Sequence, residues 1–155
     1  MTGMTLQPAF QSEMKKEGPP EGIRLVHTET MVMRWGDMDA MMHVNNTVYF
    51  RYMEQARISW IETWGVGTTA ADTEGPVIAN ASCQFRRPLK YPGGVEIRVY
   101  AGKIGRSSLP TYYEMRRVDD PETIYATGDA LFVWFSNATG KPALFPETVR
   151  RRLEA

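Results

Sequence analysis

The chain has 155 residues, with 18 basic and 18 acidic side chains and a formal net charge of zero, a size that suits one domain with its own core. It has no basic stripe, no apolar run of membrane-spanning length and no hydrophobic signal segment in its first twenty residues, which argues against nucleic acid as a main partner and against a membrane span. Cys83 is the single cysteine and cannot form a disulfide within the chain, so we expect a reducing, cytoplasmic location.

The first 22 residues are polar and rich in proline and glycine. They predict an N-terminal arm over 1–22, mobile or held against a partner subunit, followed by a single domain over 23–155. The stretch 25–35 predicts the first strand, because β-branched residues recur at alternate positions, namely Val26, Thr28, Thr30 and Val32.

The hydrophobic period changes after residue 47. Apolar residues now recur at spacings of three and four, at Tyr49, Tyr52, Met53, Ala56, Trp60 and Trp64. This spacing predicts an amphipathic helix of about five turns that ends at Gly65 or Gly67. The aromatic stripe suits a helix laid along a sheet, with core packing as its main role.

Four strand patterns follow the helix, over 77–89, 95–100, 109–118 and 123–135. The segment 131–135 is apolar on both faces, as expected for a strand that is covered on both sides. A turn over 137–142 and a short basic helix over 146–153 complete the chain. One strand, one long helix and four strands predict an α+β fold, with an antiparallel five-stranded sheet wrapped around the helix. This pattern alone leaves several topologies open.

Acid–base groups are concentrated between the first strand and the helix, in the run RWGDMDAMMHVNNTVYF over 34–50. Two carboxylates, one imidazole and two carboxamides lie within ten residues, 37–46. A helix N-terminus carries unpaired backbone N–H groups and a partial positive charge. Such a place can stabilise an oxyanion while a nearby carboxylate activates water.

This run resembles the signature of the hotdog-fold thioesterases, the 4-hydroxybenzoyl-CoA thioesterase-like group, in which the second Asp of an Asp-x-Asp pair precedes the central helix and carries the chemistry. The resemblance implies a hotdog fold, no cofactor, and a homodimer or homotetramer with sites at the subunit junction. The run also resembles the acyl-carrier-protein thioesterases, whose His is matched by His43. Those enzymes have an Asn where this chain has Met41, so their three-residue Asp/Asn/His arrangement is incomplete here.

The resemblance assigns expected roles to residues around the helix N-terminus. Asp39 is the expected general base or nucleophile, and Asp37 is expected to shape the loop or pair with Arg34. His43 is expected to orient water or the carbonyl, and the backbone N–H of Asn46 to polarise the thioester carbonyl. Asn45 is a candidate for substrate contact or for the helix N-cap, and Tyr49 for the acyl pocket or the core.

Two basic segments are candidates for contact with coenzyme A, because guanidinium and ammonium groups bind phosphate. The first is 86–92, which contains Lys90. The second contains Arg106, Ser107 and Ser108, in a stretch that resembles the family's Gly-Arg-Ser-Ser turn. Solvated surface charge is the alternative for both. With two histidines and no cysteine pair, the sequence predicts no metal site.

The predicted function is an acyl-CoA thioesterase that releases free acid and CoA. The same site acting on acyl carrier protein is an alternative, which a broad basic patch would favour because carrier proteins are acidic. A non-catalytic acyl-CoA-binding hotdog protein is the other alternative. The sequence leaves the acyl group open.

Overall fold

The computed structural model describes residues 20–155, so the predicted arm over 1–22 lies almost entirely outside the described residues. The elements are β1 (Arg24–Val32), a short 3-10 helix η1 (Trp35–Asp37), α2 (Asn46–Glu62), β2 (Glu74–Phe85), β3 (Gly94–Ala101), β4 (Ser108–Arg117), β5 (Ala126–Ser136), β6 (Lys141–Pro142) and α3 (Glu147–Glu154).

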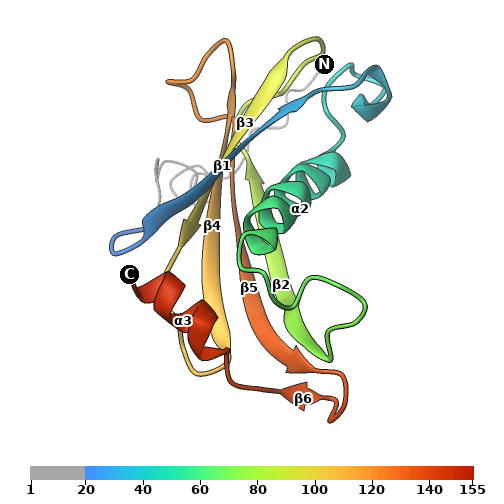
Figure 1. Cartoon of the computed structure of the whole chain (residues 1–155). Helices are drawn as coiled ribbons and strands as arrows, with labels where there is room; N and C mark the ends of the chain where they lie inside the picture. The colour runs from blue at the N-terminus through green and yellow to red at the C-terminus, as the bar shows by residue number, and fades with distance from the viewer. Residues whose placement is uncertain (1–19) are drawn as a thin grey trace, which may run out of the picture.

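The strands form one antiparallel sheet in the order β1-β3-β4-β5-β2, and the two-residue β6 pairs with the end of β5. Helix α2 lies against one face of the sheet and packs on β1, β3 and β2, while α3 lies beside the C-terminus (Figure 1). The long strands β1 and β2 are the two edges. The predicted α+β architecture, with an antiparallel sheet packed on one central helix, is confirmed.

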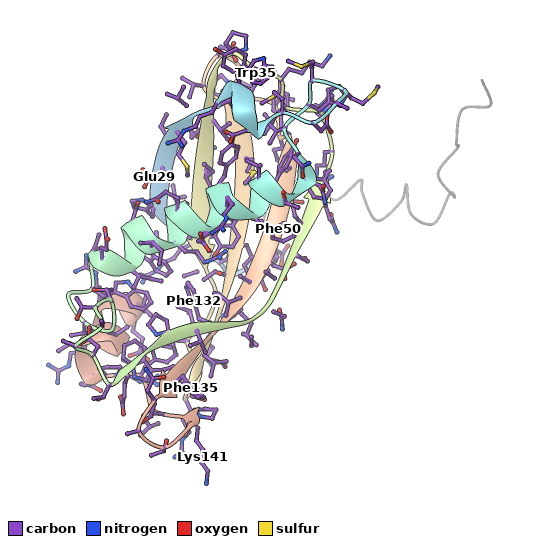
Figure 2. All side chains as sticks on the ribbon, turned by 90° about the vertical axis from the view of Figure 1, so that its right-hand side faces the viewer. Glu29, Trp35, Phe50, Phe132, Phe135 and Lys141 are labelled. Carbon is purple, nitrogen blue, oxygen red and sulfur yellow. The ribbon has the colours of Figure 1, made fainter. Side chains whose placement is uncertain are left out.

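The core lies between α2 and the sheet. On β3, Val95, Ile97 and Val99 are fully buried, as the period of two predicts, and the predicted stripe of α2 is buried against them. Figure 2 shows the side chains that fill this layer, including Phe132 of β5, whose ring contacts Trp60 near the end of α2. The chain leaves the helix through two left-handed glycines, in agreement with the predicted end of the helix.

Two strand boundaries differ from the prediction for local reasons. The first strand ends at Val32 instead of residue 35, because the backbone N–H of Arg34 donates to Asp37 Oδ2 and closes a 3-10 turn. The strand predicted over 77–89 runs from Glu74 to Phe85. The strand ends there because the backbone N–H groups of Arg86 and Arg87 both donate hydrogen bonds to the Tyr125 carbonyl, at 3.0 Å each.

The residues 131–135, which are apolar on both faces of the strand, lie in β5. Phe132 and Trp134 are buried beneath α2 and its following loop, whereas Leu131, Val133 and Phe135 lie half-exposed on the outer face. Within residues 20–155, no helix is both long enough and apolar enough to cross a membrane.

Candidate active site

Asp39 sits in a tight loop whose conformation its own side chain helps to fix. Its carboxylate oxygen Oδ1 accepts hydrogen bonds from the backbone N–H groups of Met41, at 2.8 Å, and His43, at 3.1 Å. The Asp39 N–H in turn donates to the His43 carbonyl at 2.7 Å, and Met42 takes a left-handed φ of 58° between them. The other oxygen, Oδ2, accepts no hydrogen bond from any residue in 20–155, so it is the oxygen available to water or substrate.

The N-cap residue of α2 follows six residues later. The Asn45 side-chain oxygen accepts from the N–H of Thr47 at 3.0 Å and from its hydroxyl at 2.9 Å, which is an N-cap. The Asn46 N–H makes no hydrogen bond within the described part of the chain and lies at the positive end of the helix. Asn45 thus has a capping role, and its contact with substrate stays a prediction.

Asp37 holds this loop against the helix. Its Oδ2 accepts from the Arg34 N–H at 3.0 Å and from the Tyr52 hydroxyl at 2.7 Å. Its carbonyl accepts from the Asn45 N–H at 2.9 Å. Burial, and then the hydrogen bond to Asp37, raise the pKa of Tyr52 far above its usual value. The expectation that Asp37 shapes the loop agrees with these bonds, which leave Asp39 as the carboxylate that can face a substrate.

A pocket of about 280 Å³ opens at this point. Its lining includes four of the predicted site residues together with the end of β2 and the segment after it, and consists of Asp39, His43, Val44, Asn46, Tyr49, Phe85, Arg86, Arg87 and Pro88. The Tyr49 ring meets the Phe85 ring edge to face, with centroids 4.9 Å apart. Burial raises the pKa of the Tyr49 hydroxyl, and the Leu89 N–H that donates to it opposes this shift.

A second cavity of about 560 Å³ adjoins the first and shares Arg87 and Pro88 with it. Its remaining lining is Lys90, Tyr91, Pro92, Arg117 and Tyr125. The Arg117 guanidinium is already engaged by Asp119, at 2.7 Å, and by the carbonyls of residues 90 and 92. The side chains of Arg87 and Lys90 make no hydrogen bond or ion pair with the described residues, so their charges are available to a ligand.

The other predicted basic segment lies elsewhere. Arg106, Ser107 and Ser108 precede or begin β4, whereas the pocket lies near the other end of that strand, where Met115 pairs with Ala126. A strand of ten residues spans about 30 Å. One chain therefore does not bring this segment to Asp39, and its contact with substrate stays a prediction that needs a second copy.

Two contributors were missed from the sequence. Phe85 lines the pocket from a strand that begins more than thirty residues after Asp39, and its only local signal is the basic run that follows it. Tyr52 falls in the helical core stripe, and nothing in its spacing reveals the bond to Asp37. Glu54, a further carboxylate on α2, is exposed and pairs with Arg51 at 2.9 Å. No cluster of three or more potential metal ligands occurs in residues 20–155.

Comparison with known proteins identifies the family to which the chain is similar. A sequence model described as the thioesterase-like superfamily matches residues 33–153. The structure matches the PA2801 protein of Pseudomonas aeruginosa, a proposed thioesterase, with a TM-score of 0.79 and 36% identity over 83% of this chain and 98% of that one. A proposed acyl-CoA thioesterase from Xanthomonas campestris matches with a TM-score of 0.65 and 31% identity over 72% and 93% of the two chains. YsmA of Bacillus subtilis, an uncharacterised protein, is 25% identical over 78% of this chain and 80% of its own length.

Proposed function

The chain belongs to the thioesterase-like superfamily and has its hotdog fold, and from this premise we propose that it is an acyl-CoA thioesterase that releases a free acid and CoA. One observation carries the proposal: within residues 20–155, an Asp39 carboxylate oxygen and the N–H at the start of α2 have no hydrogen-bond partner, and both belong to residues that line the same pocket. This pair offers a base or nucleophile and an oxyanion donor, the two groups that thioester hydrolysis requires.

In the proposed mechanism the thioester oxygen accepts from the Asn46 N–H at the positive end of α2. Asp39 Oδ2 takes a proton from water as the water oxygen bonds to the carbonyl carbon. The C–S bond then breaks and the CoA sulfur receives the proton. Alternatively, Oδ2 attacks the carbon itself and CoA leaves as a thiolate. Water then hydrolyses the resulting mixed anhydride to the acyl carboxylate and the Asp39 carboxylate, and one of the two protons that this step releases passes to the thiolate. His43 lines the same pocket and would orient the water or the carbonyl.

The adjoining cleft favours CoA over a carrier protein. Arg87 and Lys90 place two available positive charges next to the pocket, where the phosphates of CoA would lie. Arg117 is held by carbonyls and Asp119, so it shapes the cleft. A compact cleft of about 560 Å³ suits a nucleotide, whereas an acidic carrier protein would be met by a broader basic surface. Similarity to a proposed acyl-CoA thioesterase points the same way.

A homodimer or homotetramer forms part of the proposal. Strand β2 is an edge of twelve residues with exposed apolar side chains at Val77 and Ile78, an arrangement prone to pairing with another strand. If two β2 edges pair antiparallel, the far end of one sheet meets the near end of the other. The partner subunit's Arg106, and the serines beside it, would then approach the pocket of Asp39. This arrangement supports a site shared by two subunits.

The test is thiol release from a panel of acyl-CoA thioesters by the full chain, with and without a chelator. We expect hydrolysis that a chelator leaves unchanged. Parallel assays with the same acyl groups on acyl carrier protein should give a lower kcat/KM. A complete lack of hydrolysis with either carrier would contradict the enzymatic function and favour an acyl-CoA-binding role. Activity that disappears with the chelator and returns with a divalent ion would contradict the mechanism.

A further inference from the structure

The loop between β2 and β3 is fixed to the rest of the chain on both sides of residues 90–92. The Leu89 carbonyl accepts the Val44 N–H at 2.8 Å, and the Gly93 carbonyl accepts the Met33 N–H at 2.9 Å. The Leu89 side chain is fully buried. A Cβ added at Gly93 would lie 3.0 Å from Arg117 Cζ, so this end of the loop also packs closely against that side chain. The backbone that carries residues 90–92 therefore has a defined path.

One guanidinium holds the backbone on each side of Tyr91. Arg117 Nη1 donates to the Lys90 carbonyl at 2.6 Å, and Arg117 Nη2 donates to the Pro92 carbonyl at 2.8 Å. The Arg117 side chain is 15% exposed, and its Nε donates to Asp119 at 2.7 Å. Tyr91 itself stays 43% exposed in the lining of the second cavity. A ring with two rotatable bonds on a held backbone loses little conformational entropy when a flat ligand covers it.

The charge around this ring is positive. Among the described residues, the charged side chains that line the cavity are all basic, namely Arg87, Lys90 and Arg117. The carboxylates of the turn after β4 are engaged, Asp119 by Arg117 and Asp120 by the Tyr125 hydroxyl at 2.9 Å. The charges of Arg87 and Lys90 are left for a ligand. An exposed aromatic face beside available cations is the combination that binds a base together with its phosphates.

We propose, on the basis of the proposed function, that this cavity is the subsite for the nucleotide half of acyl-CoA and that the adenine base stacks on Tyr91. Arg87 and Lys90 face the phosphates. Arg117 is a positioning residue, because it holds the carbonyls on both sides of the ring. The cavity shares Arg87 and Pro88 with the pocket of Asp39, so the pantetheine arm would run from one into the other.

Stacking of this kind would act on substrate binding rather than on the chemical step. The nucleotide is remote from the reacting carbon and makes the same contacts in the ground state and the transition state, so its binding energy lowers KM and leaves kcat nearly unchanged. A thioester of pantetheine, which has no nucleotide, would not gain from Tyr91. The comparison between these two carriers therefore separates a nucleotide subsite from a residue that only supports the fold.

The first experiment is a calorimetric titration with free CoA, which reports binding without any reaction. The native chain is compared with Tyr91→Ala, with Tyr91→Phe, which keeps the ring, and with Tyr112→Ala. Tyr112 is a half-buried tyrosine of β4 that lines neither cavity, so it is the matched control. We expect the Kd for CoA to rise at least about fivefold in Tyr91→Ala and to stay within about twofold of the native value in the other two variants.

The second experiment compares the same acyl group carried by CoA and by pantetheine. In Tyr91→Ala the KM for the acyl-CoA should rise at least about fivefold with kcat near its native value, whereas kcat/KM for the acyl-pantetheine should not change. A titration with ATP distinguishes a substrate subsite from a general nucleotide site. We expect ATP to bind more weakly than CoA, and ATP binding as tight as that of CoA would overturn the assignment to the substrate.

Two further outcomes would overturn the subsite and leave the hydrolase intact. One is a native Kd for CoA in folded Tyr91→Ala, and the other is an equal loss of kcat/KM for the acyl-CoA and the acyl-pantetheine. Circular dichroism establishes folding, and if Tyr91→Ala does not fold, Tyr91→Leu decides, because it keeps apolar bulk and removes the aromatic face. Native protein that binds CoA through Tyr91 but hydrolyses no acyl-CoA would overturn the proposed function and leave the subsite. Native protein that neither binds CoA nor hydrolyses its thioesters would overturn both.

Discussion

The Tyr52 hydroxyl donates a hydrogen bond of 2.7 Å to Asp37 Oδ2 and so joins the loop that carries Asp39 to the second turn of α2. The same oxygen accepts the Arg34 N–H at the start of the loop, and the Asp37 carbonyl accepts the Asn45 N–H at its end. One residue thus connects both ends of the loop and the helix that presents the Asn46 N–H. We therefore expect the position of Asp39 relative to that N–H to depend on this connection.

Tyr52→Phe should lower both stability and turnover. Removing a hydrogen bond to a carboxylate costs about 1.5–3 kcal/mol, and this one is partly buried. A displaced base should reduce kcat by roughly ten- to a hundredfold. Urea unfolding and steady-state kinetics measure the two effects. Tyr100→Phe is the control, because it removes a tyrosine–carboxylate bond, to Glu114 at 3.2 Å, away from the pocket. Equal losses of kcat in the two variants would show that Tyr52 does not position the site.

The pH dependence of stability provides a second measurement on Tyr52. Burial raises its pKa in the folded state, so the folded protein holds this proton more tightly than the unfolded chain. The resulting stabilisation is complete below the ordinary tyrosine pKa of about 10 and is lost as pH rises above it. Tyr52→Phe lacks this contribution, so its free energy of unfolding should decrease less steeply above about pH 10 than that of the native chain.

Asp39→Asn should separate the chemistry from the fold of the loop. The amide oxygen can still accept from the N–H groups of Met41 and His43, so we expect little change in Tm or KM. Loss of the base or nucleophile should reduce kcat by roughly 10²–10⁴-fold. Asp37→Asn should reduce kcat far less. If Asp37→Asn has the larger effect on kcat, the assignment of the catalytic carboxylate is wrong.

Cys83 should react slowly with thiol reagents. Burial, and next the negative charge of Asp129, raise the pKa of its thiol to about 12. At pH 8 its thiolate fraction should be lower than that of an ordinary cysteine by about 10³-fold, and alkylation should slow in proportion. The rate of iodoacetamide labelling, compared with that of a cysteine in the urea-unfolded chain, measures this. Equal labelling rates in the folded and unfolded protein would show that the fold does not protect the Cys83 thiol.

The subunit interface proposed at β2 should be sensitive to charge. Ile78→Asp places a carboxylate on the exposed edge and should shift a dimer toward monomers and lower the activity. Leu144→Asp, outside the sheet, is the matched control. Light scattering and assays at the same micromolar concentration measure both effects. A native protein that is monomeric and fully active at assay dilution would disprove the shared site.

The sequence was sufficient for the individual elements because their signals are local, whereas the hotdog topology was expected only from the resemblance of the motif. The stripe of α2, the alternation in β3 and the glycines after the helix each lie within one element, and each predicted the observed structure. The N-cap at Asn45 was also among the predicted alternatives, since capping involves residues two positions apart. The predicted ends of strands were less accurate where a backbone N–H donates to a carbonyl that is distant in the sequence, as the Arg86 N–H does to Tyr125.

The pocket could not be predicted in full because its walls come from segments far apart in the chain. Phe85 reaches the helix only after β2 has paired with β5, and this register is a property of the whole sheet. Arg106 lies at the other end of β4 from the pocket for the same reason, because its position depends on the direction in which that strand runs in the sheet. Similarity to a short motif specifies neither how far apart two segments of one chain lie nor which subunit of a dimer supplies a residue to the site.

The way Asp39 is held has a consequence for how this scaffold can change. Both donors to its Oδ1 come from the next four residues, so the proposed reactive group is held by its own loop. The residues that would select a substrate, Phe85 and Arg87, belong instead to the end of an edge strand and the segment after it. Substitutions there can alter selectivity without moving the carboxylate. One such loop can thereby be combined with many substrate pockets on the same sheet.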